Sequence, residues 1–190
     1  QHLSAQMAPD KILNLVYAFC DDIVKKDLVS NVAIGGALIS LLGKCERIED
    51  AENIFGGLSR HEILSWTEMV SAYVENGHPD KALQLYGKIA RNDVSPDQHT
   101  IAISIQACNI RLELEDSTFL EKDVILEIGH ALHAKARKYH FVSNVYISSS
   151  LITMYGKCGH IREAENLFFV RSTTHNVVTW TAMLSVYLEQ

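Results

Sequence analysis

The sequence has few residues that cross-link a small fold or interrupt its helices. It contains four cysteines and three prolines among 190 residues, and the cysteines stand singly, without a Cys-x-x-Cys pair. This spacing argues against a disulfide framework and is typical of small buried side chains in a reducing compartment. No apolar run approaches the ~18 residues that a membrane-spanning helix needs, so we expect no membrane among its partners.

The motifs of common enzymes are also missing. The sequence contains no phosphate-binding loop, nucleophile elbow or His-Glu-x-x-His string. His130 and His133 are three residues apart on one predicted helix, but no cysteine or carboxylate at helical spacing completes a set of metal ligands. The sequence therefore predicts no catalytic residues, no metal site and no cofactor, and it indicates that the chain is not an enzyme.

The sequence has fewer basic than acidic residues. The 17 Lys and Arg residues are outnumbered by 23 Asp and Glu residues, which gives a net charge of −6, and the segment 109–126 alone carries half of it. Proteins that bind nucleic acids usually carry a basic stripe, so this balance predicts weak binding to any nucleic acid. With 47% apolar residues, the chain still has enough material for a packed core.

An internal repeat dominates what is present. Residues 29–55 align with residues 142–168, and 15 of the 27 positions are identical. A second pair follows each copy, because SWTEMVSAYVE from Ser65 matches TWTAMLSVYLE from Thr179. Repetition of this kind predicts a fold built by stacking one small structural unit.

Within each repeat, apolar residues three and four positions apart predict two amphipathic helices joined by a short turn. Two such helices lie antiparallel, and each leaves an apolar face that a stacked neighbour must cover. The sequence therefore predicts an all-α fold, an α-solenoid of stacked antiparallel helix pairs, as a single array over residues 1–190. The predicted repeats are 1–31, 32–62, 63–97, 98–144, 145–176 and 177–190, the first and last incomplete, with an acidic insert near 109–126 expected to form a lengthened turn.

Three kinds of repeat differ in length and in residues. ALISLLGKCERIEDAENIF and SLITMYGKCGHIREAENLF resemble the short repeat, SWTEMVSAYVENGHPDKALQLYGKIARNDVSPD the standard repeat, and IAISIQAC with EIGHALHAKARKYHFVSN the long repeat of plant pentatricopeptide repeat (PPR) proteins of the PLS subclass. By this resemblance 32–62 and 145–176 are short repeats, 63–97 is standard and 98–144 is long, while 1–31 is a partial long repeat and 177–190 a truncated standard repeat. The resemblance implies a right-handed superhelix that binds single-stranded organellar RNA at about one base per repeat.

The resemblance also implies which residues meet the RNA. In this family the residue after the tryptophan, or its equivalent, reads the base together with the last residue of the repeat, and the second residue of the repeat stacks on it. By the family's code, Thr67 with Asp97 resembles a guanine reader, and Ser149 with Asn176 resembles an adenine reader. The other base-reading candidates are Gly36 with Glu62, Ala102 with Asn144, and Thr181, and the base-stacking candidates are Leu64, His99, Tyr146 and Val178.

By the same resemblance, the chain is part of an RNA editing or processing (RNA modification) factor of a mitochondrion or chloroplast, with other editing or processing factors as further partners. Some relatives carry a zinc domain with His-x-Glu and Cys-x-x-Cys that edits cytidine, and this sequence has neither string. The acidic charge and the insert motivate an alternative, a protein-binding helical scaffold like tetratricopeptide arrays. That alternative predicts that substitution of Thr67 or Asp97 leaves partner binding unchanged.

Overall fold

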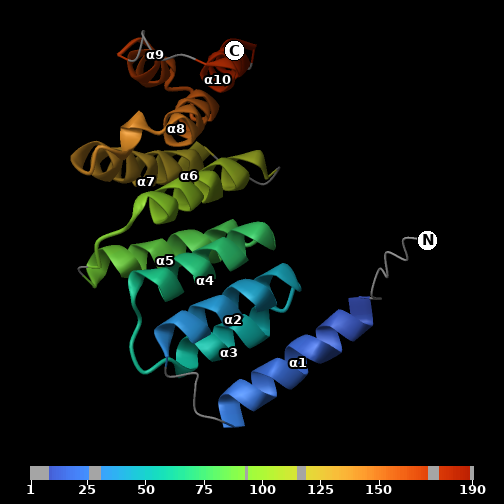
Figure 1. Cartoon of the computed structure of the whole chain (residues 1–190). Helices are drawn as coiled ribbons and strands as arrows, with labels where there is room; N and C mark the ends of the chain where they lie inside the picture. The colour runs from blue at the N-terminus through green and yellow to red at the C-terminus, as the bar shows by residue number, and fades with distance from the viewer. Residues whose placement is uncertain (1–8, 26–30, 93, 115–118, 171–175, 189–190) are drawn as a thin grey trace. The chain divides into compact units, whose positions relative to one another are not determined.

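The structure, a computed structural model, describes residues 9–25, 31–92, 94–114, 119–170 and 176–188. Every regular element in these ranges is a helix and none is a strand, which confirms the predicted all-α class (Figure 1). The elements are α1 (Pro9–Lys25), α2 (Val32–Lys44), α3 (Ile48–Gly57), α4 (Ile63–Glu75), α5 (Pro79–Arg91), α6 (Gln98–Glu113), α7 (Phe119–Lys138), the short 3₁₀ helix η2 (Phe141–Ser143), α8 (Val145–Lys157), α9 (Ile161–Phe169) and α10 (Val177–Leu188).

Five of these helices, α2, α4, α6, α8 and α10, begin at the residues where the predicted repeats begin, and we call them the first helices. The turns that follow α2, α4 and α8 each contain one residue with left-handed backbone geometry, at Glu46 (φ 59°), Gly77 (φ 73°) and Gly159 (φ 77°). Glycine adopts this geometry without steric cost, so two of the three turns need no strain. The division into short, standard and long repeats stays a prediction.

The chain forms two compact units, residues 1–76 and 77–190. In the first unit, α2 packs against both α3 and α4. In the second unit, α6 packs against α5, α7 and α8, and α8 also packs against α9 and α10. First helices of successive repeats therefore lie side by side within each unit. The cores are apolar and fully buried, with Ile39, Leu42 and Met69 in the first unit and Ile105, Leu132, Leu151 and Met154 in the second.

The acidic insert differs from the lengthened turn that we expected. Its first residues continue α6 as far as Glu113 and its last residues belong to α7, so these helices have 16 and 20 residues where α2, α4 and α8 have 13. The helical pattern continues because side chains of the insert are buried. Arg111 is 7% exposed and its Nε donates to Oδ1 of Asp80 at 3.1 Å, and Ile125 is buried as well. Residues 115–118 lie outside the described ranges.

The four cysteines are free, and Cys108 is fully buried. Burial raises the pKa of Cys108 to about 12 and that of Cys158 to about 11, so both thiols stay protonated and unreactive at neutral pH. These properties agree with the structural role predicted from their spacing. In the part of the chain that the structure describes, no helix is long and apolar enough to cross a bilayer.

Candidate nucleic-acid interface

The last residue of a predicted repeat lies at the N-cap of the next first helix. Oδ1 of Asn144 accepts hydrogen bonds from the backbone N–H groups of Tyr146 (2.8 Å) and Ile147 (3.3 Å). Oδ1 of Asp97 accepts from the N–H of Thr100 at 2.7 Å. Asn and Asp are strongly preferred at this position because they satisfy amide groups that have no partner within the helix. The sequence pattern would have predicted these caps, although we had interpreted the residues only as base readers.

Asn176 is engaged in a reciprocal cap. Its Oδ1 accepts from the N–H of Thr179 at 3.1 Å, while its own N–H donates to Oγ1 of Thr179 at 3.1 Å. Glu62 differs, because it precedes α4 without a side-chain capping bond and its carboxylate is paired with Arg60. Each capping side chain has a second polar group that takes no part in these capping bonds, which is Nδ2 of the asparagines and Oδ2 of Asp97.

The predicted reading residues of the first turns carry hydroxyl groups on three helices. Oγ1 of Thr67 donates to the carbonyl of Ile63 at 2.8 Å, Oγ of Ser149 to that of Tyr146 at 3.1 Å, and Oγ1 of Thr181 to that of Val177 at 2.8 Å. A hydroxyl has one proton and two lone pairs, so a hydroxyl group that donates its proton can also accept a hydrogen bond. Thr67 and Ser149 are buried, whereas Thr181 is exposed. Gly36 and Ala102, at the equivalent positions of α2 and α6, offer no polar side chain.

A groove of about 560 Å³ lies at the N-terminal ends of α6 and α8. Five of the predicted site residues line it, together with Gln98, and we call it the α6–α8 groove. Tyr146 is 71% exposed and His99 is exposed as well, so both rings are accessible. The predicted residues that the structure brings together here are Asp97, His99, Ala102, Asn144 and Tyr146.

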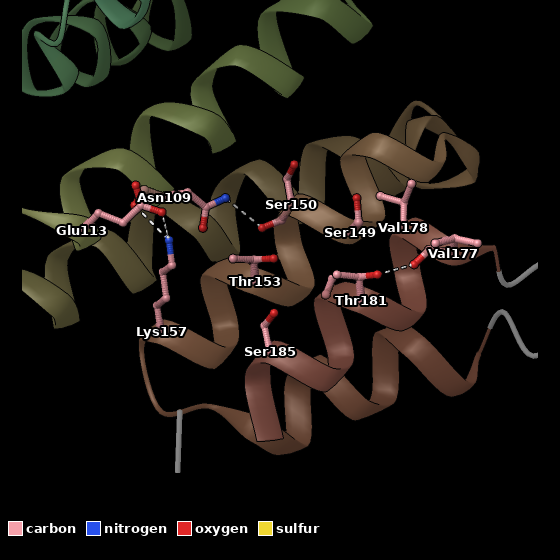
Figure 2. A pocket seen from close by; sticks show the side chains of 11 residues that line it. Asn109, Glu113, Ser149, Ser150, Thr153, Lys157, Val177, Val178, Thr181 and Ser185 are labelled. Atoms are coloured by element: carbon pink, nitrogen blue, oxygen red, sulfur yellow. Dashed lines mark hydrogen bonds and ion pairs between the residues drawn. The ribbon is translucent and has the colours of Figure 1, made fainter. Parts of the chain in front are cut away.

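A second groove, of about 510 Å³, lies between α8 and α10, and we call it the α8–α10 groove. Figure 2 shows Ser149, Val178 and Thr181 grouped at one end of it, where α8 and α10 begin. Asn176, the predicted partner of Ser149, is not among the residues that line this groove. The structure therefore brings together three predicted site residues here and leaves out the fourth.

In the first unit, Gly36 lies against the next first helix. A Cβ atom added to Gly36 would lie 3.3 Å from Cγ of Leu64, so the predicted reading position and the predicted stacking position are adjacent. Leu64 is 44% exposed. Thr67 belongs to the unit 1–76 and Asp97 to the unit 77–190.

Sequence reasoning missed Lys157, at the far end of the α8–α10 groove. Its ammonium group forms an ion pair with the carboxylate of Glu113, the last residue of α6, and its side chain is 14% exposed (Figure 2). The internal repeat contains the signal that could have found it, because Lys44 and Lys157 occupy equivalent positions in the two aligned copies.

Comparison with protein families places these helices in a known class. A model described as the PPR repeat family matches residues 61–109, and a PPR repeat model matches residues 36–63 and 146–169. The chain belongs to the pentatricopeptide repeat family. The matched ranges include parts of both units and the first turns of α4, α6 and α8.

Plant PPR proteins are similar to the chain over most of its length. A pentatricopeptide repeat-containing protein of Arabidopsis thaliana, named as chloroplastic, is 29% identical and matches 86% of this chain and 24% of its own length. Another, named as mitochondrial, is 30% identical and matches 80% of this chain and 22% of its own length. The chain spans about a fifth of the length of the curated relatives that it matches first.

A solved PPR structure has the same fold. The crystal structure of the pentatricopeptide repeat protein PPR10 from maize matches 91% of this chain and 24% of its own chain, with a TM-score of 0.58 and 22% sequence identity. This similarity confirms the predicted α-solenoid of stacked helix pairs.

Outside the two grooves, the PPR repeats hold a small histidine cluster. Nδ1 of His133 lies 2.9 Å from Oη of Tyr155, and the ring of His130 lies 5.5 Å from the ring of Tyr155. Both histidines line a cavity of about 350 Å³ between α7, α8 and α9. Among the described residues, no group of three or more His, Cys, Asp or Glu side chains is placed to hold a metal ion.

This cluster makes stability depend on pH. Burial holds the pKa of His133 below its usual value, and Arg137 and His130 lower it further. The unfolded chain then binds the proton more tightly, so the contribution of His133 to the free energy of unfolding is complete above about pH 6.5 and declines as the pH falls through that value. We expect the urea midpoint to fall between about pH 7.5 and pH 5, and we expect His133→Gln to flatten part of this fall. His61 is half-buried, and because burial also lowers its pKa, it accounts for some of the remainder. An unchanged pH profile in the His133 variant would contradict this assignment.

Proposed function

We propose that this chain binds single-stranded RNA along its first helices, as part of an organellar RNA editing or processing factor. The observation that carries the proposal is the succession of two grooves in the unit 77–190. The first lies at the N-terminal ends of α6 and α8, and the second runs along α8 and α10. Stacked repeats present equivalent positions at a regular rise, so successive grooves can receive successive bases. Membership of the PPR family supports this use of the surface.

The α6–α8 groove offers both stacking surfaces and a polar edge. Tyr146 and His99 present aromatic faces on which a base can stack, and stacking tolerates any base. Asn144 can donate to a base from Nδ2 and Asp97 can accept from a base at Oδ2, while Ala102 has no hydrogen-bonding group in its side chain. We propose that the edge of a base is read here by side chains that the helix caps already hold in place.

The α8–α10 groove differs in character. Ser149 and Thr181 provide hydroxyl groups that can accept from a base, and Val178 provides an apolar surface for packing against it. By the family's code, Ser149 with Asn176 reads adenine and Thr67 with Asp97 reads guanine. We propose these assignments, and with them the PLS order of the repeats.

The proposal includes a location in the cell. Curated relatives named as chloroplastic and as mitochondrial support a place in one of these organelles. Other editing or processing factors are proposed as partners on the strength of the family resemblance. With a net charge of −6, this chain should bind RNA weakly, and its binding should be measured at low salt.

A mobility-shift assay with short single-stranded RNAs tests the proposal. The RNAs differ only at the base expected opposite the repeat 63–97, and wild type is compared with Thr67→Asn. We expect the preference to change from guanine towards a pyrimidine, because the amide offers a different set of donors and acceptors. Gln106→Ala, which removes an exposed side chain of α6 that lines neither groove, is the matched control and should keep the guanine preference.

A different result would favour a second candidate. Equal binding to all four bases by both proteins would contradict base reading at Thr67. Absence of any RNA binding would favour a protein-binding scaffold, for which the acidic net charge is the motivating observation.

A further inference from the structure

The α8–α10 groove contains a cation that is already neutralised. Lys157 ends α8, and its Nζ contacts the carboxylate of Glu113 and the carbonyl oxygen of Asn109, the latter at 3.5 Å. Figure 2 shows its side chain reaching across to α6, on the same groove as Ser149 and Thr181. The side chain of Lys157 is 14% exposed and that of Glu113 is 63% exposed, so solvent reaches the pair from the carboxylate side.

Glu113 does not stabilise its own helix. It is the last residue of α6, where the backbone carbonyl groups already create negative potential and a carboxylate is unfavourable. Lys157, in contrast, lies at the C-terminus of α8, where a cation is favoured. The Glu113 side chain is therefore held by the lysine rather than by α6.

The end of α6 is fixed close to the groove by a separate contact. Nδ2 of Asn109 donates to the carbonyl oxygen of Ser150 at 3.0 Å, which ties α6 to α8 beside the ion pair. The carboxylate of Glu113 therefore remains near Lys157 through the backbone, even when a competing anion displaces it. It acts at a high local concentration, because it is tethered to the same unit.

The equivalent lysine of the earlier copy gives an internal comparison. Lys44 ends α2 as Lys157 ends α8, and it is exposed. In the described ranges, no carboxylate forms an ion pair with Lys44. Lys157 differs in that its groove is bordered by the C-terminal end of α6, which the acidic insert extends to Glu113.

We infer that Glu113 competes with RNA phosphate for Lys157 and so lowers the affinity of the α8–α10 groove for RNA. This inference rests on the proposed RNA-binding function. A phosphate oxygen and a carboxylate oxygen are interchangeable acceptors for an ammonium group, which has three donors and no preferred plane. RNA entering this groove must displace Glu113 before Lys157 can bind the backbone. Glu113 is consequently an affinity-determining residue that makes no favourable contact with RNA.

Fluorescence anisotropy with a labelled single-stranded RNA, measured over a series of salt concentrations, tests this competition. We expect Glu113→Gln to bind RNA roughly two- to fivefold more tightly at low salt, the range that one screened ion pair supplies. The plot of log affinity against log salt should become steeper by about 0.7, the value for one additional phosphate contact on a single strand. Glu127→Gln, an exposed change on α7 with the same change in net charge, is the control and should have a smaller effect on both quantities.

The double variant Glu113→Gln with Lys157→Gln identifies the cation. It should bind RNA like Lys157→Gln alone, because Glu113 acts only through Lys157. A gain that persists without Lys157, a gain equal to that of Glu127→Gln, or weaker binding by Glu113→Gln would each overturn the inference. RNA binding by the wild type with no change in Glu113→Gln overturns this inference alone, whereas failure of every variant to bind RNA overturns the proposed function as well.

Discussion

Gly43→Ala is expected to lower the free energy of unfolding by about 1–3 kcal/mol, the usual cost of overfilling a packed interface. An added Cβ would lie 2.7 Å from Cβ of Ala72 and 3.1 Å from its Cα, and neither atom can move without moving α4. Since α2 and α4 are packed along their lengths, the two helices would have to separate. Urea unfolding followed by circular dichroism measures the change.

The control is the same substitution in an open environment. Gly56 lies inside α3, and an added Cβ there would meet no atom within 4 Å. Gly56→Ala should therefore stabilise the protein by about 0.4–1 kcal/mol, because alanine restricts the unfolded chain. Equal effects of the two substitutions would show that close approach of the helices does not require Gly43.

The second copy provides a repetition of this test. Gly156 is equivalent to Gly43, and an added Cβ would lie 2.3 Å from Cγ2 of Val186 on α10. The β-branched valine has little rotamer freedom with which to avoid the clash. Gly156→Ala should therefore destabilise the unit 77–190 in the same direction.

Tyr146→Ala is expected to weaken RNA binding by about 1–3 kcal/mol, which is the range for loss of one base stacked on an aromatic ring. Tyr146 is 71% exposed in the α6–α8 groove, so removal of its ring should leave the thermal midpoint nearly unchanged. Tyr146→Phe keeps the ring and should bind RNA like the wild type. Anisotropy measurements with one RNA compare all three proteins.

The opposite pattern would reject this role. If Tyr146→Ala binds RNA as the wild type does, while Tyr146→Phe also shows no change, the ring does not stack on a base. If both variants weaken binding equally, the hydroxyl group rather than the ring face is the important feature. The first result would require a different path for RNA past α8.

The periodicity of apolar residues was sufficient to predict the helix pairs, because the pattern is local and occurs twice. The short turn within each helix pair could be predicted for the same reason. The helical continuation of the insert could not, because it depends on Arg111 reaching Asp80 and on burial of Ile125, which are tertiary contacts. The surplus residues predict a lengthened turn instead, because repeat proteins tolerate insertions at the edge of the solenoid.

The candidate site was predictable in part. Family positions identified Asp97, Asn144 and Tyr146, and the structure places these residues around one groove. The ion pair between Glu113 and Lys157 joins residues 44 positions apart, and no local pattern indicates such a pair. Asn176 shows a further limit, because equivalent sequence positions do not ensure that a residue lines the expected groove.

Under the proposed function, the capping residues at the starts of the first helices restrict how this protein can change its target. A residue such as Asn144 holds the start of α8 with one atom and leaves the other for a ligand. Replacement by Asp, Ser or Thr preserves a cap, whereas an apolar residue costs about 0.5–2 kcal/mol of stability before any base is considered. The set of residues that can vary here is therefore fixed first by folding. New specificities can therefore evolve or be engineered with little loss of stability only among these polar capping residues. Wider changes must come from the other predicted reading position, in the first turn of the helix, whose side chain does not cap it.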